Sequence, residues 1–193
     1  MPEKLPLIES ERLLLRLLEP EDMKAAMTFW QENLEDLAPY GPKMPDNFLT
    51  EEFWKAQISR NKKEFLADVS ARMFLFEKSA ADKVICGYVS LAAILRAAAQ
   101  FCYLGYGLAK NKRRLGYMSE ILPQTTKYAF EELNLHRIMA NYMPTNERSG
   151  RLLKRLGFSI EGYARDYLYL NGEWQDHILT SLSNPNWQQR NSD

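Results

Sequence analysis

The chain has 193 residues, of which 46% are hydrophobic and 26% are charged, so it has enough apolar material for one globular domain with a continuous core. Lys and Arg together number 25, as do Asp and Glu, so the formal net charge is zero. This balance argues against a strongly basic nucleic-acid-binding protein, and we expect no direct DNA binding.

The sequence offers few metal ligands or disulfide partners. Cys86 and Cys102 lack CxxC spacing, and the two histidines are His136 and His177. We therefore expect no metal site and no disulfide framework, which favours a cytoplasmic location. No apolar stretch reaches the roughly 20 residues that span a bilayer, so no membrane association is expected. The N-terminal residues carry acids and prolines where a signal peptide needs an apolar region.

The first part of the chain predicts one strand and two helices. Leucines and arginines alternate over residues 12–18 as in a strand, and residues 19–22 then open a helix with Pro20 and acids in its first turn. Apolar residues follow at helical spacing as far as Leu34. Thr50 is a good N-cap residue and predicts a second helix over residues 50–66.

The middle of the chain predicts three strands, over residues 71–77, 83–91 and 100–108. A short turn at residues 80–82 makes the first two an antiparallel hairpin. A basic loop at residues 110–116 then leads into a helix over residues 117–133.

The last part predicts a strand over residues 136–143, a helix over residues 146–156 and a hairpin of strands 158–170 and 173–181. Gly157 is a typical helix stop, and Asn171-Gly172 is a strong hairpin turn signal. The order predicts an α/β fold with one mixed sheet, helices on its faces and parallel pairing near the middle. We expect residues 1–183 to form a single domain and residues 184–193 a polar, mobile tail.

The basic loop is the strongest local signal for a ligand. Lys110, Lys112, Arg113 and Arg114 precede a helix N-terminus, where free N–H groups and cations attract phosphate or pyrophosphate. Gly116 allows the backbone to approach such a ligand closely. From these residues alone, a solvated basic loop is an equally good interpretation. Neither a Walker loop nor GxGxxG is present.

Seven short segments, in order along nearly the whole chain, carry a family resemblance. They are residues 11–16 (ERLLLR), 102–106 (CYLGY), 135–144 (LHRIMANYMP), 146–150 (NERSG), 156–158 (LGF), 161–163 (EGY) and 171–177 (NGEWQDH). Together they resemble the GNAT N-acetyltransferases and, within them, the RimJ/RimL group of ribosomal-protein-alanine N-acetyltransferases. The resemblance implies the GNAT fold, a mostly antiparallel central sheet with splayed parallel middle strands and flanking helices.

The resemblance also implies acetyl-CoA as co-substrate. Its pantetheine arm would lie between the strands at residues 100–108 and 136–143, with the pyrophosphate over residues 113–119. The implied cofactor-binding residues are Leu108, Arg113, Arg114, Leu115, Gly116, Tyr117, Met118, Ser119 and Asn146.

Two features depart from the family pattern. The family's cofactor loop reads Q/R-x-x-G-x-G/A, where this chain has Asn111 at the first position and Arg114 at the first glycine. An arginine held in a glycine conformation costs about 1–3 kcal/mol, which a phosphate contact would offset. Pro123 lies inside the predicted cofactor helix, where a proline usually introduces a kink.

The implied reaction is attack of a neutral amine on a thioester. An α-amino group has a pKa of about 7.7–8.0, so a weak base reached through water suffices. A backbone N–H from residues 106–108 is expected to stabilise the oxyanion. By its match to the family position, Ser149 is expected to donate its hydroxyl proton to the departing thiolate. The alternative is a structural partner of the N-cap Asn146.

Asp166 is the first candidate for the base, ahead of Glu161 and Glu173. Its alternative is an ordinary surface carboxylate. His136 is interpreted as a structural hydrogen-bonding residue at the start of a strand.

The resemblance implies an N-terminal alanine of a small-subunit ribosomal protein as acceptor, reached on the assembling small subunit, by a monomer or weak dimer. A basic partner would suit acidic residues of the first two helices, which are otherwise a solvated face: Glu32, Glu35, Asp36, Asp46, Glu51 and Glu52. Two alternatives stay open. One is acetylation of a small amine such as a polyamine. The other is a ribosome-assembly factor with an acetyl-CoA site weakened by Arg114 and Pro123.

Overall fold

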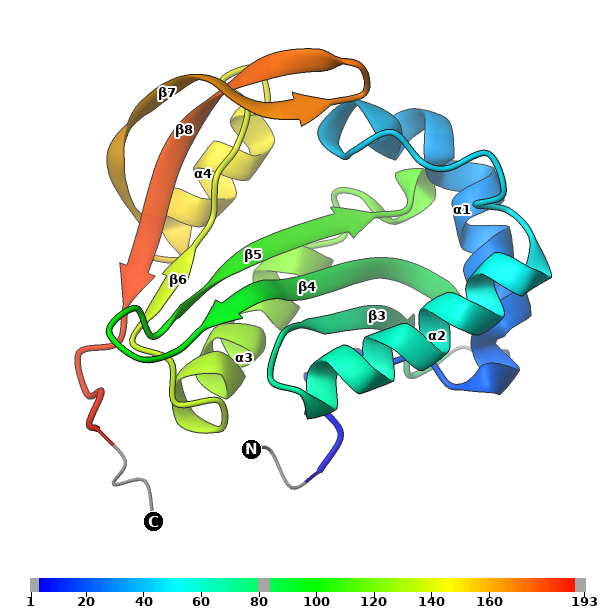
Figure 1. The fold of residues 1–193 in the computed structure, drawn as a ribbon, viewed down its shortest axis with the longest axis horizontal. Coiled ribbons are helices and arrows are strands. Elements are labelled where there is room, and N and C mark those ends of the chain that lie inside the picture. Colours follow the sequence, from blue (N-terminus) through cyan, green and yellow to red (C-terminus); the bar gives the residue numbers. More distant parts are fainter. Residues whose placement is uncertain (1–3, 80–83, 190–193) are drawn as a thin grey trace.

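The computed structural model describes residues 4–79 and 84–189, and its centre is one eight-stranded sheet (Figure 1). The strand order is β1-β2-β3-β4-β5-β6-β8-β7, and every neighbouring pair is antiparallel except β5 and β6. The strands are β1 Leu7–Glu9, β2 Leu13–Arg16, β3 Ala71–Glu77, β4 Ile85–Leu95, β5 Phe101–Leu108, β6 Arg137–Met139, β7 Ser159–Leu170 and β8 Glu173–Ser183.

Within the described residues, four α-helices flank the sheet: α1 Met23–Leu37, α2 Glu51–Leu66, α3 Tyr117–Glu131 and α4 Glu147–Arg155. The same part of the chain has three short 3-10 helices, at Pro20–Asp22, Ala38–Tyr40 and Lys110–Lys112. Helices α1 and α2 cover one face of the sheet and α3 the other, as Figure 1 shows.

The two faces of the sheet bury different side chains because successive residues of a strand point to opposite sides. In β3, Met73 and Leu75 join the core under α3, whereas Phe74 and Phe76 join an aromatic core under α1 and α2. Burial on both faces explains why the β3 sequence is a nearly continuous apolar run.

The sheet opens between its two parallel strands. β5 pairs with β6 only from Phe101 to Tyr103, and β5 then continues to Leu108 while β6 ends at Met139. The chain after β6 follows β8 instead, with a bridge between Tyr142 and Ile178. Figure 1 shows β5 and the β6–α4 segment diverging, which confirms the expected splayed middle strands.

The predicted fold class is confirmed, and the differences from the sequence prediction are local. The three-residue strand β1 was not predicted, since Leu7–Glu9 is too short to show a period. The strand predicted over residues 136–143 is regular only at Arg137–Met139, because the chain there leaves β5 for β8. β3 and β4 pair antiparallel as predicted, but their turn at residues 80–82 lies outside the described residues.

Helix α3 continues through Pro123 rather than ending there. A proline has no N–H, so the carbonyl of Ser119 has no donor four residues later in the helix. After β8, Asn184 N donates to the carbonyl of His136 at 2.7 Å, and Trp187 Nε1 donates to that of Asn134 at 3.0 Å. The start of the predicted tail is therefore attached to the α3–β6 connection. Within the described residues, no helix is long and apolar enough to cross a membrane.

Candidate active site

The loop before α3 has a backbone shaped for close approach of a ligand. Gly116 is the N-cap of α3 with φ of 82°, and Arg114 has φ of 65°. The expectation that Arg114 stands in a conformation suited to glycine is therefore confirmed. The N–H groups of the first helical turn, from Tyr117 to Ser119, have no acceptor within the helix. Together with the exposed Arg114, they make this helix start suited to an anion.

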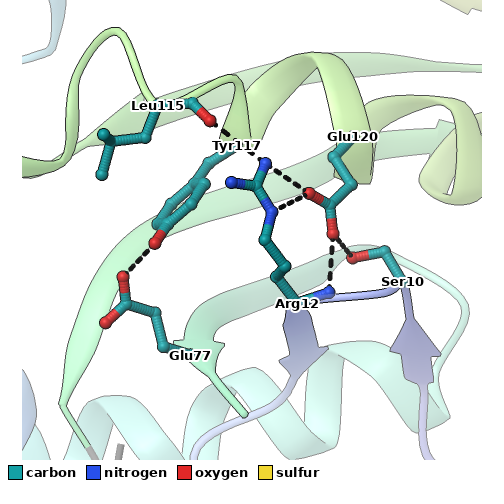
Figure 2. Close-up of polar contacts among 6 residues, drawn as sticks. All are labelled: Ser10, Arg12, Glu77, Leu115, Tyr117 and Glu120. Atoms are coloured by element: carbon teal, nitrogen blue, oxygen red, sulfur yellow. Dashed lines mark hydrogen bonds and ion pairs between the residues drawn. The ribbon is translucent and has the colours of Figure 1, made fainter. Parts of the chain in front are cut away.

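Arg12 and Glu120 attach this loop to the edge of the sheet (Figure 2). Arg12 donates through Nε to Glu120 at 2.7 Å and through Nη2 to the carbonyl of Leu115 at 3.1 Å. The Glu120 carboxylate also accepts from Ser10 Oγ at 2.7 Å and from Arg12 N at 2.8 Å. The β1–β2 connection thus fixes both the loop and the first turn of α3, a role the sequence did not reveal for Arg12.

A second attachment runs through Glu77 at the end of β3. Tyr117 donates its hydroxyl proton to Glu77, and Lys112 Nζ lies 2.8 Å from the same carboxylate (Figure 2 shows the tyrosine contact). The bonds from Lys112 and Tyr117 lower the pKa of Glu77, and the bond to Glu77 raises the pKa of Tyr117 to about 12. The aromatic ring of this predicted cofactor residue is therefore structural.

Helix α1 holds the start of the same loop. The buried Asn33 accepts from Lys110 N at 2.8 Å, and Asp36 pairs with Lys110 at 3.3 Å and Arg113 at 3.2 Å. Asp36 was expected among acceptor-facing acids. Instead it holds two cations of the cofactor loop.

Across the opening in the sheet, Tyr106 of β5 meets Ser149 of α4 at 2.8 Å between hydroxyl oxygens. Asn146 caps α4 by accepting from Ser149 N at 3.2 Å, which leaves the Ser149 hydroxyl available to Tyr106. Burial raises the pKa of Tyr106, so its phenol stays protonated at neutral pH. Either hydroxyl can donate in this contact, and when Tyr106 donates, the single hydroxyl proton of Ser149 is left for a third group.

A cleft of about 1170 Å³ contains this pair and passes through the opening. Its cofactor end includes Leu108, residues 113–114 and 116–119 and Asn146, while Leu115 lies outside the lining. Met118 is in the cleft wall yet buried in the core, and Ser119 Oγ lies 3.5 Å from Arg155. Six arginines line the cleft: Arg72, Arg113, Arg114, Arg148, Arg151 and Arg155.

The opposite end of the cleft is aromatic. The rings that line it come from α1, α2, the loop between them and the sheet: Trp30, Tyr40, Phe48, Phe53, Trp54, Tyr88 and Tyr103. Among the described residues, no aspartate or glutamate lines the cleft. The acidic residues expected to face an acceptor are therefore outside it.

The structure does not bring the candidate bases to Ser149. Asp166 is exposed, and its N–H donates to Asp176 at 2.8 Å where β7 is irregular. Glu161 pairs with Arg137 and accepts from Ser181 at 2.9 Å, and Glu173 is exposed at the hairpin end. His136 lies against the Trp187 ring, away from the cleft lining.

A protein family described as "Acetyltransferase (GNAT) domain" matches residues 12–159. This chain belongs to the GNAT acetyltransferase family. It is an acetyl-CoA-dependent N-acetyltransferase, as the resemblance of its segments implied. The residues fit that co-substrate: the β5 edge freed beyond Tyr103 offers backbone groups to a pantetheine arm, and the arginines and helix start suit its phosphates.

Individual relatives match over nearly the full chain. The "[Ribosomal protein uS5]-alanine N-acetyltransferase" of Escherichia coli (strain K12) is 38% identical over 181 residues, 93% of this chain and 92% of that protein. "Probable N-acetyltransferase YjcK" of Bacillus subtilis (strain 168) is 32% identical over 95% of this chain and 100% of its own. The crystal structure of the ribosomal-protein-S5-alanine acetyltransferase from Vibrio fischeri aligns with a TM-score of 0.89 at 34% identity, covering 95% of this chain and 100% of that one.

Proposed function

We propose that this chain transfers the acetyl group of acetyl-CoA to the N-terminal alanine of a small-subunit ribosomal protein. The similarity to the Escherichia coli and Vibrio fischeri enzymes that act on S5 alanine supports this acceptor. A ribosomal acceptor implies a cytoplasmic enzyme that reaches its substrate free or on the assembling subunit, as a monomer or weak dimer.

The side chains that line the cleft favour an N-terminal amine over a polyamine as the acceptor. A polyamine has several cationic amines, and a site for it needs carboxylates to pair with those charges. The described lining contains six arginines and no carboxylate. A neutral N-terminal amine on a small apolar residue suits the aromatic end much better than a polycation does.

The reaction follows from the placement of the side chains. The neutral amine nitrogen attacks the thioester carbon, a C–N bond forms, the nitrogen releases one proton, and the C–S bond breaks to release a thiolate. With Tyr106 as the donor to Ser149, the Ser149 hydroxyl donates a hydrogen bond to that sulfur. A thiol is a stronger acid than an alcohol, so the proton stays on Ser149; its hydrogen bond stabilises the thiolate, which takes a proton from water on release. An N–H near the end of β5 serves the oxyanion.

The proposed cofactor contacts divide into two kinds. Leu108, Gly116, Tyr117, Met118 and Ser119 contribute main-chain groups, whereas Arg113, Arg114 and Asn146 contribute side chains, in keeping with their places in the cleft wall. Leu115 acts through its carbonyl, which holds Arg12. We do not assign Asp166 as the base, because its side chain is exposed and lies outside the cleft lining.

The test is calorimetry with acetyl-CoA, followed by titration of a peptide that begins with the N-terminal alanine sequence of a small-subunit ribosomal protein. Free thiol and peptide mass are followed together. The matched control is the same peptide already acetylated at its N-terminus. Thiol release with a gain of one acetyl group on the free peptide alone is the expected result.

The alternatives predict different results in the same experiment. If spermidine releases thiol and the alanine peptide does not, the acceptor is a small amine. If acetyl-CoA neither binds nor raises the melting temperature, the chain is a binding factor with a degenerate site.

A further inference from the structure

Among the described residues that line the cleft, one side chain is an imidazole, the group that most often serves as a general base in enzymes. Arginine cannot be deprotonated in proteins, tyrosine keeps its proton, and no described carboxylate lines the cleft. His177 of β8 also lines it, although only 3% of its surface is exposed. Resting on the proposed function, we propose that His177 Nε2 is the catalytic base that accepts the proton of the attacking α-amine.

The ring of His177 is held in the tautomer that this role needs. Its Nδ1 lies 3.0 Å from the carbonyl oxygen of Gln175. A carbonyl oxygen only accepts, so Nδ1 carries the proton and Nε2 carries the lone pair. Among the described residues, Nε2 has no hydrogen-bond partner.

The irregular part of β7 builds the wall beside this ring. Between Ala164 and Leu168 the register with β8 shifts, and Asp166 there has φ of 45°. Asp176 fixes the irregularity by accepting from the Asp166 N–H and from the Tyr163 hydroxyl. Such bulges redirect side chains beside active sites. Here Tyr167 packs against His177 with ring centroids 5.6 Å apart.

The groups around the ring leave its lone pair available. Tyr167 of β7 accepts from Asn141 at 3.2 Å, and burial, followed by the bond with Tyr103 of β5, raises the pKa of Tyr167. Asp176 of β8 interacts electrostatically with the imidazole from its own strand. Tyr167 and Asp176 are thus the titratable neighbours shown for this ring, and Tyr103 contacts Tyr167 rather than the imidazole.

The proton balance of the step is complete. As the C–N bond forms, the nitrogen gains positive charge and releases one proton to Nε2. The C–S bond breaks toward the sulfur, which accepts the hydrogen bond from Ser149. His177 then returns its proton to solvent, and the thiolate takes one from solvent. The base comes from strand β8 and the thiolate donor from helix α4, so each acts on its own reactant.

The experiment measures the single-turnover rate of acetyl transfer to the alanine peptide from pH 5.5 to pH 9. The His177→Gln and His177→Asn variants are compared with wild type, and His136→Gln serves as the matched control. In His177→Asn, the side-chain amide nitrogen takes the place of Nδ1 as the donor to the Gln175 carbonyl, and no atom lies at the position of Nε2. Calorimetry with acetyl-CoA checks that each variant keeps its cofactor site.

We expect both His177 variants to lose about 100-fold or more of the rate at pH 7 and to lose the dependence of the rate on pH that wild type shows, while His136→Gln retains both. A His177 variant that binds acetyl-CoA and reacts within threefold of wild type overturns the proposal. Wild type that binds acetyl-CoA yet leaves the peptide unacetylated is a failure of the proposed function instead.

A measurement on the wild-type protein avoids any folding defect of the variants. The chain has two histidines, so nitrogen NMR of the labelled protein resolves both rings, with His136→Gln giving the assignment. A neutral ring with its proton on Nδ1 is expected for His177. An Nε2–H tautomer overturns the proposal.

Discussion

The cofactor end and the aromatic end of the cleft are built by opposite means. At the cofactor end, the loop before α3 is held by polar side chains from distant segments, Arg12, Glu77, Asn33 and Asp36, most of them in reach of water. At the aromatic end, rings of α1 and α2 pack on β3 and β4 in a core.

The difference predicts which measurement each end controls. Packing of large buried rings dominates folding stability, whereas exposed ion pairs contribute little to stability but fix the geometry of a binding loop. Changes at the aromatic end are therefore expected to appear first in unfolding, and changes at the cofactor end in affinity or turnover.

The largest expected effect is the loss of Trp30. Its ring is 7% exposed and stacks on Tyr88 with centroids 5.5 Å apart. Trp30→Ala should lower the free energy of unfolding in urea by about 3–5 kcal/mol. Tyr40→Ala is the control, since Tyr40 is 47% exposed, and should change it by less than about 1 kcal/mol. Equal effects of the two variants would contradict the division between the ends.

The second expected effect is on turnover at the opening between the ends. Ser149→Ala and Tyr106→Phe should each lower kcat by roughly 10- to 100-fold, with the dissociation constant of acetyl-CoA changed less than threefold. Because the two hydroxyls act in series, the double variant should be no slower than the slower single variant. Multiplying effects would show that they act independently.

The fold was predictable because its elements carry strong local patterns. Periodicity marked both α1 and α3, Thr50 marked the start of α2, and Asn171-Gly172 marked the last hairpin. The three-residue strand β1 and the departure of the chain from β6 to β8 depend on tertiary pairing, which no local pattern contains.

The site was predictable in part for a similar reason. The loop before α3 was singled out by its basic residues, and Ser149 was expected from the family resemblance. The partner of Ser149, Tyr106, lies 43 residues earlier, and their contact needs the sheet to open between β5 and β6. Asp166 was a reasonable base by its position in β7, but an irregular strand turns it to solvent and Tyr167 toward the cleft. The sequence signals for His177 were its place at the end of segment 171–177 and the presence of only two histidines in the chain.

The third expected effect concerns the strained Arg114. Arg114→Gly removes both the guanidinium and the cost of φ 65°, while Arg114→Ala removes the guanidinium alone. The glycine variant should be about 1 kcal/mol more stable than the alanine variant in urea unfolding. Both should weaken acetyl-CoA to a similar degree by calorimetry. If Arg114→Gly instead binds tenfold more tightly, about 1.4 kcal/mol, Arg114 is no phosphate contact at all.

The smallest expected effect is that of Glu77 on the free energy of unfolding, and this effect is expected to decrease toward acid pH. Lys112 and Tyr117 lower the pKa of Glu77 below its usual 4.5. The ionised carboxylate therefore adds to the free energy of unfolding above pH 4.5, and this stabilisation is lost as the pH falls through the lowered pKa. Glu77→Gln should cost at most about 1 kcal/mol at pH 7, and its stability should converge with that of wild type in acid.

Glu9→Gln is the matched control, because Glu9 pairs with Lys78 where both side chains are well exposed. It should change the stability at pH 7 by less than about 0.5 kcal/mol. A Glu77→Gln deficit that persists unchanged in acid would mean that the carboxylate charge is irrelevant and that the hydrogen bond from Tyr117 alone holds the loop. The cofactor end would then resemble the aromatic end, with neutral packing in place of ion pairs.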